Sequence, residues 1–483
     1  MPLHCLLLLL ACLGAASVAA QPPACKMRIT DKGLALVKQE GLRFVEQELE
    51  NISIPDLQGK YGKFYYNISN VKVTHLQLNF SELHFQPEQF LAFRINNGSI
   101  GVRFRRQLLY WFFYDVGSIQ TWAEGVNIHT LLELSRDEGG RLKITNMSCS
   151  ASIAHMQAGF SGTLRKVYEF VARLITRGVR YLLSQQICPA LNHAALVLLN
   201  SLLDTVPVRN PVDEHVGSDY SLLSDPHVTA QSIDLDFKGM FFPLRSENET
   251  LPNVAPEPLL RETERMVYLG LSEYFFDSAL FSYYRAGALS MEFVGDEVGR
   301  PLNYQKAVLL SPLDPDVVDA PLTLKLQVTK APHCTIRPSG TYIYVSAVLN
   351  IFLAPPDQPQ ILLSSLIMLI GAFFSVFTTG SSKPLQTTPP LVPTLFPAPL
   401  QLLPLQAPLQ TLLQMTIMPF INERTERGVQ IPLPEGMDFT QEAVRSHLGY
   451  LTIGADLHFT KGLREVIEKL RATPGSSLAS TAA

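Results

Sequence analysis

The sequence predicts an α+β protein of two similar halves, in which antiparallel strands wrap around long apolar helices. Both halves contain segments in which apolar and polar residues alternate, which is the pattern of half-buried strands. Both halves also contain helical patterns whose apolar face is wider than an ordinary surface helix needs. Between the halves, residues 243–260 are rich in proline, as linkers often are. With 483 residues, the chain is also too long for one ordinary domain.

Residues 1–20 have the pattern of a signal peptide. An apolar stretch begins at Leu6, and the small residues Ser17, Ala19 and Ala20 precede the expected cleavage after Ala20. A short membrane anchor is the alternative. Acceptor sites for N-linked glycans follow at Asn51, Asn67, Asn79, Asn97, Asn146 and Asn248. Together these features predict a secreted, extracellular glycoprotein.

The first half, residues 21–242, is expected to form an N-terminal domain. Apolar residues at helical spacing predict a helix over residues 34–49. Strict alternation over residues 100–105 predicts a half-buried strand. A second, very apolar helix is expected over residues 164–187, where Cys188 and Pro189 would end it. A further apolar helix is expected over residues 191–203.

The second half, residues 261–473, repeats these patterns and is expected to form a C-terminal domain. Alternation predicts strands over residues 322–328, 342–347 and 451–459, and helical spacing predicts a helix over residues 409–422. Residues 474–483 are expected to be a flexible tail.

The composition argues against nucleic-acid binding, and the motifs argue against catalysis. Lys and Arg total 39 against 43 Asp and Glu, a formal net charge of −4, whereas nucleic-acid-binding proteins are normally basic. Residues 159–162 resemble the start of a nucleophile elbow, but Thr163 breaks the motif. No zinc-protease, P-loop or dinucleotide motif is present. We therefore expect no enzyme, cofactor or metal site; an esterase is the enzyme alternative.

The wide apolar helix faces have two interpretations. The ordinary one is that they form a packed core. The other is that part of each face lines a cavity that holds acyl chains, as the interiors of wide strand-wrapped tubes can. The candidate lipid-contacting residues on these helices are Leu34, Val37, Val45, Val179, Leu182 and Leu183.

The run from Leu108 to Tyr114 consists entirely of large apolar or amphipathic residues. Such a run cannot face one side of a strand, so either both faces are buried or the segment is an exposed tip. Trp and Tyr favour lipid–water interfaces, and arginine binds phosphate. The candidate residues for docking to a lipid surface are Tyr110, Trp111, Phe112 and Phe113, with Arg105 and Arg106 beside them.

Cysteine counting leaves the disulfide pairing open. Outside the signal peptide the chain has Cys25, Cys149, Cys188 and Cys334, and four cysteines allow three pairings.

Several long segments resemble one known family. They are Leu36–Leu49, Arg105–Val116, Val197–Val208, Arg265–Ala279, Asn422–Gly436 and Leu451–Ile467. The chain resembles the bactericidal/permeability-increasing, lipopolysaccharide-binding and plasma lipid transfer proteins, and most of all the phospholipid-transfer members. The resemblance implies a boomerang of two elongated barrels joined by a central sheet, each with phospholipid in an apolar tunnel. It implies a Cys149–Cys188 disulfide with Cys25 and Cys334 free, and it favours the exposed position for residues 110–113.

The same resemblance implies a function. The expected protein is a secreted carrier that moves phospholipid between lipoproteins, especially high-density lipoprotein, whose surface and apolipoproteins would be its partners. Lipopolysaccharide binding in host defence is the alternative within the family, although it usually requires a basic first domain.

Residues 361–408 depart from the family pattern. The family has alternating strands there, whereas this chain has an apolar run over residues 361–377 and a Pro-rich stretch over residues 384–408. Proline cannot donate to a strand ladder, so we expect this segment not to supply barrel strands and to be poorly packed. The apolar run is near the lower limit for a membrane span, which makes an anchor the alternative.

Overall fold

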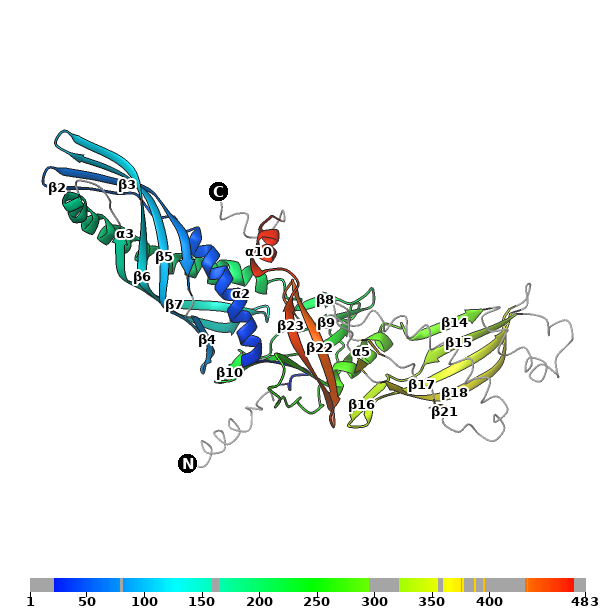
Figure 1. Cartoon of the computed structure of the whole chain (residues 1–483). Coiled ribbons are helices and arrows are strands. Elements are labelled where there is room, and N and C mark those ends of the chain that lie inside the picture. Colours follow the sequence, from blue (N-terminus) through cyan, green and yellow to red (C-terminus); the bar gives the residue numbers. More distant parts are fainter. Residues whose placement is uncertain are drawn as a thin grey trace, which may run out of the picture.

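The structure is a computed structural model that describes residues 21–472 apart from 79–80, 159–164, 295–320, 355–358, 375, 378–385, 388–393, 396–430 and 432. The molecule is elongated, with one sheet at its centre and a curved sheet toward each end (Figure 1). The predicted α+β class and the tandem arrangement around a central sheet are confirmed. The predicted signal peptide, the tail, the helix over residues 409–422 and Asn79 lie outside the described residues.

The central sheet combines strands from both halves of the chain. All its pairs are antiparallel, and its order is β10-β11-β1-β13-β23-β22. Met27 of β1 pairs with Leu235 on one side and with Leu269 on the other, and all three side chains are buried. The strands are β1 (Cys25–Thr30), β10 (His227–Val228), β11 (Ser232–Phe237), β13 (Val267–Ser272), β22 (Met437–Ser446) and β23 (Tyr450–Phe459).

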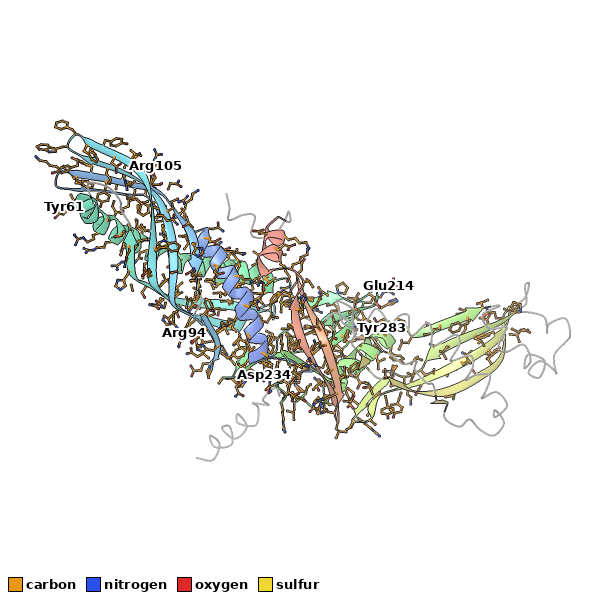
Figure 2. All side chains as sticks on the ribbon, in the orientation of Figure 1. Tyr61, Arg94, Arg105, Glu214, Asp234 and Tyr283 are labelled. Atoms are coloured by element: carbon orange, nitrogen blue, oxygen red, sulfur yellow. A yellow bond between two sulfur atoms is a disulfide. The ribbon has the colours of Figure 1, made fainter. Side chains whose placement is uncertain are left out.

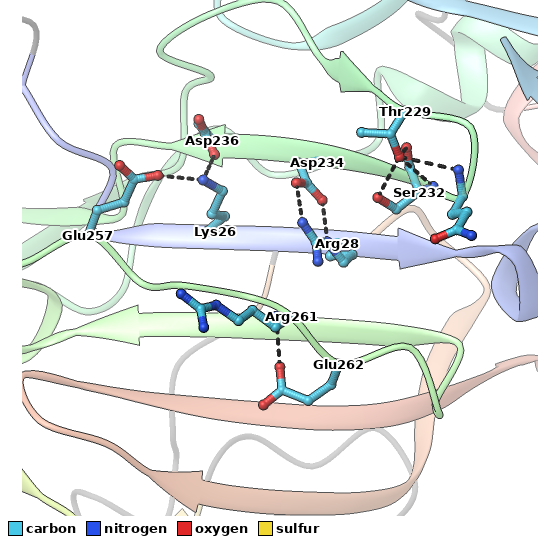
Figure 3. Close-up of polar contacts among 10 residues, drawn as sticks. Lys26, Arg28, Thr229, Ser232, Asp234, Asp236, Glu257, Arg261 and Glu262 are labelled. Atoms are coloured by element: carbon cyan, nitrogen blue, oxygen red, sulfur yellow. Dashed lines mark hydrogen bonds and ion pairs between the residues drawn. The ribbon is translucent and has the colours of Figure 1, made fainter. Parts of the chain in front are cut away.

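Charged side chains tie β1 to β11 and to the Pro-rich stretch (Figure 3). Arg28 donates two hydrogen bonds of 2.7 Å to the carboxylate of Asp234. Lys26 Nζ lies 3.3 Å from Asp236 Oδ1 and also contacts Glu257. Residues 244–260 contain no helix or strand, so the contact between Lys26 and Glu257 holds this irregular segment against the sheet.

The N-terminal sheet is a curved antiparallel sheet of order β2-β3-β5-β6-β7, with β4 pairing with β5. The alternation predicted for residues 100–105 is confirmed, since Ile100, Val102 and Phe104 are buried while Arg103 and Arg105 are exposed. The strands are β2 (Leu57–Tyr61), β3 (Phe64–Gln77), β4 (Ser81–Gln86), β5 (Phe90–Tyr110), β6 (Phe113–Arg136) and β7 (Leu142–Ala158).

Two long helices pack against this sheet, α2 (Asp31–Glu50) and α3 (Arg165–His193). The prediction that Cys188 and Pro189 end the second helix is wrong. The helix passes through Pro189, which is exposed, and continues as a π-helical segment η1 (Ala194–Leu199) and a short α4 (Asn200–Leu203). Burial of Ile187 and Leu191 on either side of Pro189 favours continuing the helix over breaking it.

A disulfide joins α3 to β7. Cys149 is bonded to Cys188, with 5.7 Å between their Cα atoms. Cys25 and Cys334 are free and buried. The pairing implied by the family resemblance is therefore confirmed.

The C-terminal sheet has the order β14-β15-β17-β18-β21, with β16 pairing with β17. The prediction that residues 361–408 supply no barrel strand is wrong for residues 361–374, since β18 (Ile361–Phe374) pairs with β17 along its length. This run contains no proline, so its backbone can donate throughout the ladder. The other strands are β14 (Ser290–Val294), β15 (Leu322–Val328), β16 (His333–Arg337), β17 (Gly340–Leu353) and β21 (Thr394–Leu395).

The remaining elements are short or join the main parts. The helix α5 (Glu273–Arg285) follows β13, and α10 (Leu463–Ala472) packs against α2 and α4. The small strands are β8 (Arg209–Pro211), β9 (Val216–Asp219), β12 (Met240–Pro243), β19 (Val376–Phe377) and β20 (Gln386–Thr387).

Candidate functional site

The aromatic run predicted from the sequence lies at the turn between β5 and β6, at the far end of the N-terminal sheet (Figure 1). Tyr110 pairs with Phe113, so Trp111 and Phe112 are the two central residues of the turn. Trp111 has a φ of 52°, a left-handed value that tight hairpin turns use but bulky residues rarely adopt. Phe112 is 98% exposed and Trp111 is 61% exposed. The run is therefore on the surface, and its docking role remains a prediction.

A second hairpin turn lies beside the first. Gly62 and Lys63 connect β2 to β3, and Phe64 at the start of β3 pairs with Tyr110. Lys63 Nζ lies 4.1 Å from the centre of the Trp111 ring, a cation–π contact. Tyr61, at the end of β2, is 60% exposed. We call Tyr61, Lys63 and residues 110–113 together the aromatic tip.

Tyr61 and Lys63 were not predicted from the sequence. Their proximity to the aromatic run depends on pairing between β3 and β5, which the local sequence does not specify. The available signal was the dipeptide Gly62-Lys63 between the aromatic residues Tyr61 and Phe64, a position suited to a tight turn.

The two predicted docking arginines differ in their surroundings. Arg105 is exposed on the outer face of β5 and lies at the same end of the molecule as Tyr61 (Figure 2). Arg106 is largely buried and forms an ion pair of 2.8 Å with Asp115 on the neighbouring strand. Of the two, Arg105 is thus the residue whose exposure suits contact with an external phosphate.

Arg105 belongs to a basic hollow that sequence analysis did not identify. Lys72, Arg103 and Arg105 line a surface hollow of about 370 Å³ below the aromatic tip. Asn70, which also lines it, has a φ of 52° beside a register shift in β3. No acidic residue is among the described lining residues, so the hollow has a positive electrostatic character.

Four of the six predicted lipid-contacting residues lie in one apolar cluster. Val179 and Leu183 of α3 are fully buried in it, and Val45 of α2 and Leu182 are partly buried against it. The cluster also contains the inward side chains of β3, β5 and β6. Leu34 belongs instead to the core around the central sheet, and Val37 is partly buried on α2.

The apolar surface of α3 and its extension is not fully covered by protein. By length and composition alone, the stretch Ala172–Leu203 could cross a membrane, yet only 33% of its most apolar part is buried within the fold. Leu182, Val197 and Leu199 on this stretch are all partly exposed. A helix this apolar is normally buried throughout, so this stretch leaves apolar surface that the described residues do not cover.

Comparison with known proteins identifies the family. The N-terminal domain of the LBP / BPI / CETP family matches residues 33–205, and its C-terminal domain matches residues 210–459. The chain belongs to the LBP / BPI / CETP family. It is 58% identical to phospholipid transfer protein of Homo sapiens, covering 96% of this chain and 95% of that protein. It is 54% identical to phospholipid transfer protein of Mus musculus, covering 94% and 93%.

A solved structure supports the fold assignment. The crystal structure of lipopolysaccharide binding protein matches this LBP / BPI / CETP family member with a TM-score of 0.62 and 24% identity, covering 91% of this chain and all of that one. At this identity the match concerns the fold alone, and it agrees with the two curved sheets around a central sheet.

The strongest shifts in ionisation lie in the central region of this family member, away from the aromatic tip. Burial raises the pKa of the Cys25 thiol, and burial close to Asp277 and Glu273 raises the pKa of the Cys334 thiol. Burial also raises the pKa of Tyr274 to about 12. These groups therefore stay protonated at neutral pH, and neither thiol is activated as a nucleophile. Within the described part of the chain, no cluster of three or more metal-ligating side chains is present.

Proposed function

We propose that this chain is a secreted carrier that binds phospholipid beside α2 and α3 and moves it between lipid surfaces. Lipoproteins, including high-density lipoprotein and its apolipoproteins, are the proposed partners. The observation that carries the proposal is the incompletely buried apolar surface of α3, next to a curved sheet that ends in exposed aromatic rings. The similarity of almost the whole chain to relatives named phospholipid transfer protein supports it.

Phospholipid transfer requires an apolar environment for the acyl chains, and it requires no catalytic group. Transfer of an acyl chain into water costs about 0.8 kcal/mol per methylene, so a two-chain lipid leaves a bilayer very slowly. In an apolar pocket beside Val45, Val179 and Leu182 the acyl chains would contact protein instead of water. The free energy of moving the lipid from the bilayer into the protein would then be close to zero. The partly exposed leucines of α3 provide the surface such a lipid would cover.

Docking requires reversible contact with a lipid surface, and the aromatic tip is suited to it. Full burial of a large apolar side chain contributes roughly 1.5–3 kcal/mol, so Trp111, Phe112 and Phe113 can together hold the protein without fixing it permanently. Lys63 and Arg105 would add salt-dependent attraction to phosphate groups.

Lipopolysaccharide binding is the second candidate. The basic hollow around Lys72, Arg103 and Arg105 favours it, because arginine and lysine bind phosphate groups. The formal net charge of −4 opposes it. Relatives named lipopolysaccharide-binding protein are also far less similar, at 26% identity in Mus musculus and 27% in Homo sapiens.

The proposal is tested on the purified full chain from a secreting cell line. Solvent extraction should release phospholipid, and the protein should move fluorescent phospholipid from donor to acceptor vesicles. Absence of both bound phospholipid and transfer would refute the carrier function. Tight binding of lipopolysaccharide without vesicle transfer would instead favour the second candidate.

A further inference from the structure

A second hollow lies near the aromatic tip, on the outer face of the N-terminal sheet. Its volume is about 510 Å³, and its walls include side chains from β2, β3, β5 and the start of β6. Two cross-strand rows form its base. One row contains Gln58, Asn67 and Gln107, and the other contains Lys60, Tyr65, Leu109 and Tyr114.

The orientation of β3 decides which side chains face this hollow. Phe64, Tyr66 and Ile68 pack into the apolar cluster beneath the sheet. Because side chains alternate along a strand, Tyr65 and Asn67 point to the opposite, outer face. The hollow therefore contains an acceptor asparagine of an Asn-Ile-Ser site and, two residues earlier on the same face, an aromatic ring.

The Asn67 carboxamide can accept a sugar without losing its existing contact. Its Nδ2 donates to Gln107 Oε1 at 3.1 Å. Attachment of a glycan replaces one of the two Nδ2 hydrogens and leaves the other for Gln107. Its Oδ1 is shielded from solvent and has no hydrogen-bond donor among the described residues.

The walls of the hollow suit a sugar ring. Tyr65 is 46% exposed and Tyr114 is 61% exposed, so each presents ring surface to the space beside Asn67. A sugar has an apolar C–H face that packs on such rings, and hydroxyl groups that bond to amides such as those of Gln58 and Gln107.

We propose that the N-linked glycan expected at Asn67 lies in this hollow, with its first sugars between Tyr65 and Tyr114. The seated glycan covers the outer face of β2 and β3 and holds the edge strand β2 in place. Asn67 lies roughly 17 Å along the strand from the turn at Gly62, so the rings of Trp111 and Phe112 stay free to contact lipid. Asn248 is the contrasting site, since it is exposed and has no aromatic residue within two positions.

Site-specific digestion of the native protein tests this proposal. The full chain is secreted from a mammalian cell line and treated with peptide-N-glycosidase F without denaturation, and site occupancy is followed by peptide mass spectrometry. Release from Asn67 should be on the order of tenfold slower than release from Asn248, the factor that corresponds to about 1.4 kcal/mol. Tyr114→Ala should accelerate release at Asn67 and leave Asn248 unchanged, whereas Tyr114→Phe should keep the slow rate.

Tyr65→Ala provides an independent variant should Tyr114→Ala fail to be secreted. An unmodified Asn67 in the secreted protein would overturn the proposal. Equal release rates at Asn67 and Asn248, or an Asn67 rate unaffected by loss of either ring, would also overturn it. None of these results depends on lipid transfer, which is measured separately.

Discussion

At the scale of single residues, exposure and pairing distinguish side chains that look equivalent in the sequence. Arg105 and Arg106 are adjacent and were predicted to share one role. The alternation of β5 turns Arg105 outward into the basic hollow and turns Arg106 toward Asp115. Trp111 and Phe112 are exposed because they are the turn residues of a hairpin. The aromatic sequence around them does not show where the turn lies.

Replacement of Trp111, Phe112 and Phe113 together by alanine should leave folding and bound lipid intact and weaken binding to lipoproteins and vesicles. If each ring is only partly buried in the lipid surface and contributes roughly 1 kcal/mol, loss of all three weakens binding about a hundredfold. Flotation with vesicles measures binding, and thermal denaturation measures folding. Trp122→Ala is the control, since Trp122 is 40% exposed but lies away from the tip. A triple variant that unfolds, or that binds normally, would contradict the docking role.

Arg105→Gln and Arg106→Gln should affect different properties, vesicle binding in the first case and stability in the second. Arg105→Gln removes an exposed charge, so stability should stay unchanged while vesicle binding becomes weaker and less dependent on salt. Arg106→Gln removes a largely buried ion pair with Asp115, and the free energy of unfolding should fall by about 1–3 kcal/mol. Denaturant titration measures the stability of each variant, and vesicle binding at two salt concentrations measures the charge contribution. Equal effects of the two substitutions would show that the assignment of roles is wrong.

At the scale of elements, the disulfide is the covalent tie between the sheet and its helix. Cys149→Ala should lower the free energy of unfolding by about 4 kcal/mol on the chain-entropy model, given a separation of 39 residues. The double variant Cys149→Ala, Cys188→Ala avoids a lone thiol and should be destabilised to a similar extent. Secretion yield and denaturant titration provide the measurements. An unchanged unfolding free energy would mean that packing between α3 and β7 suffices without the bond.

The elements also show how far the sequence can be interpreted. Helix α2 and the alternation around Ile100 were predictable because their apolar spacing is a local property. Pro189 misled the prediction, since burial of α3 outweighed the local penalty of a proline. For β18 the apolar run gave no period of two, and only its partner β17 makes it a strand. The second hairpin of the tip was missed for the same reason, because its position depends on distant pairing.

At the scale of the whole molecule, distant parts of the chain are interleaved. The central sheet places the strand at Cys25–Thr30 between strands from residues 232–237 and 267–272, and no local pattern predicts this order. The helix α10 returns to the N-terminal half, where Val466 and Ile467 pack with Phe44 and Leu198. In this arrangement α3, with the proposed cargo surface, packs against the same curved sheet that ends in the aromatic tip, yet the two surfaces are separate.

That separation predicts that cargo binding and docking can be lost independently. Leu182→Gln places an unpartnered amide on the proposed acyl-chain surface of α3, where a polar group without a hydrogen bond costs about 1–3 kcal/mol. The variant should retain less phospholipid and transfer it more slowly, while flotation with vesicles stays normal. Tyr181→Gln is the matched control, because Tyr181 is the preceding residue on the same helix and is 65% exposed.

The tip variant should show the reverse pattern, with normal lipid content and weak flotation. Phospholipid assay after solvent extraction, measured on the same preparations as flotation, compares the two directly. Normal lipid content and transfer in Leu182→Gln would move the cargo away from this face of α3. A joint loss of cargo and docking in either variant would mean that the two surfaces act as one, and that lipid must occupy the interior before the tip can engage a surface.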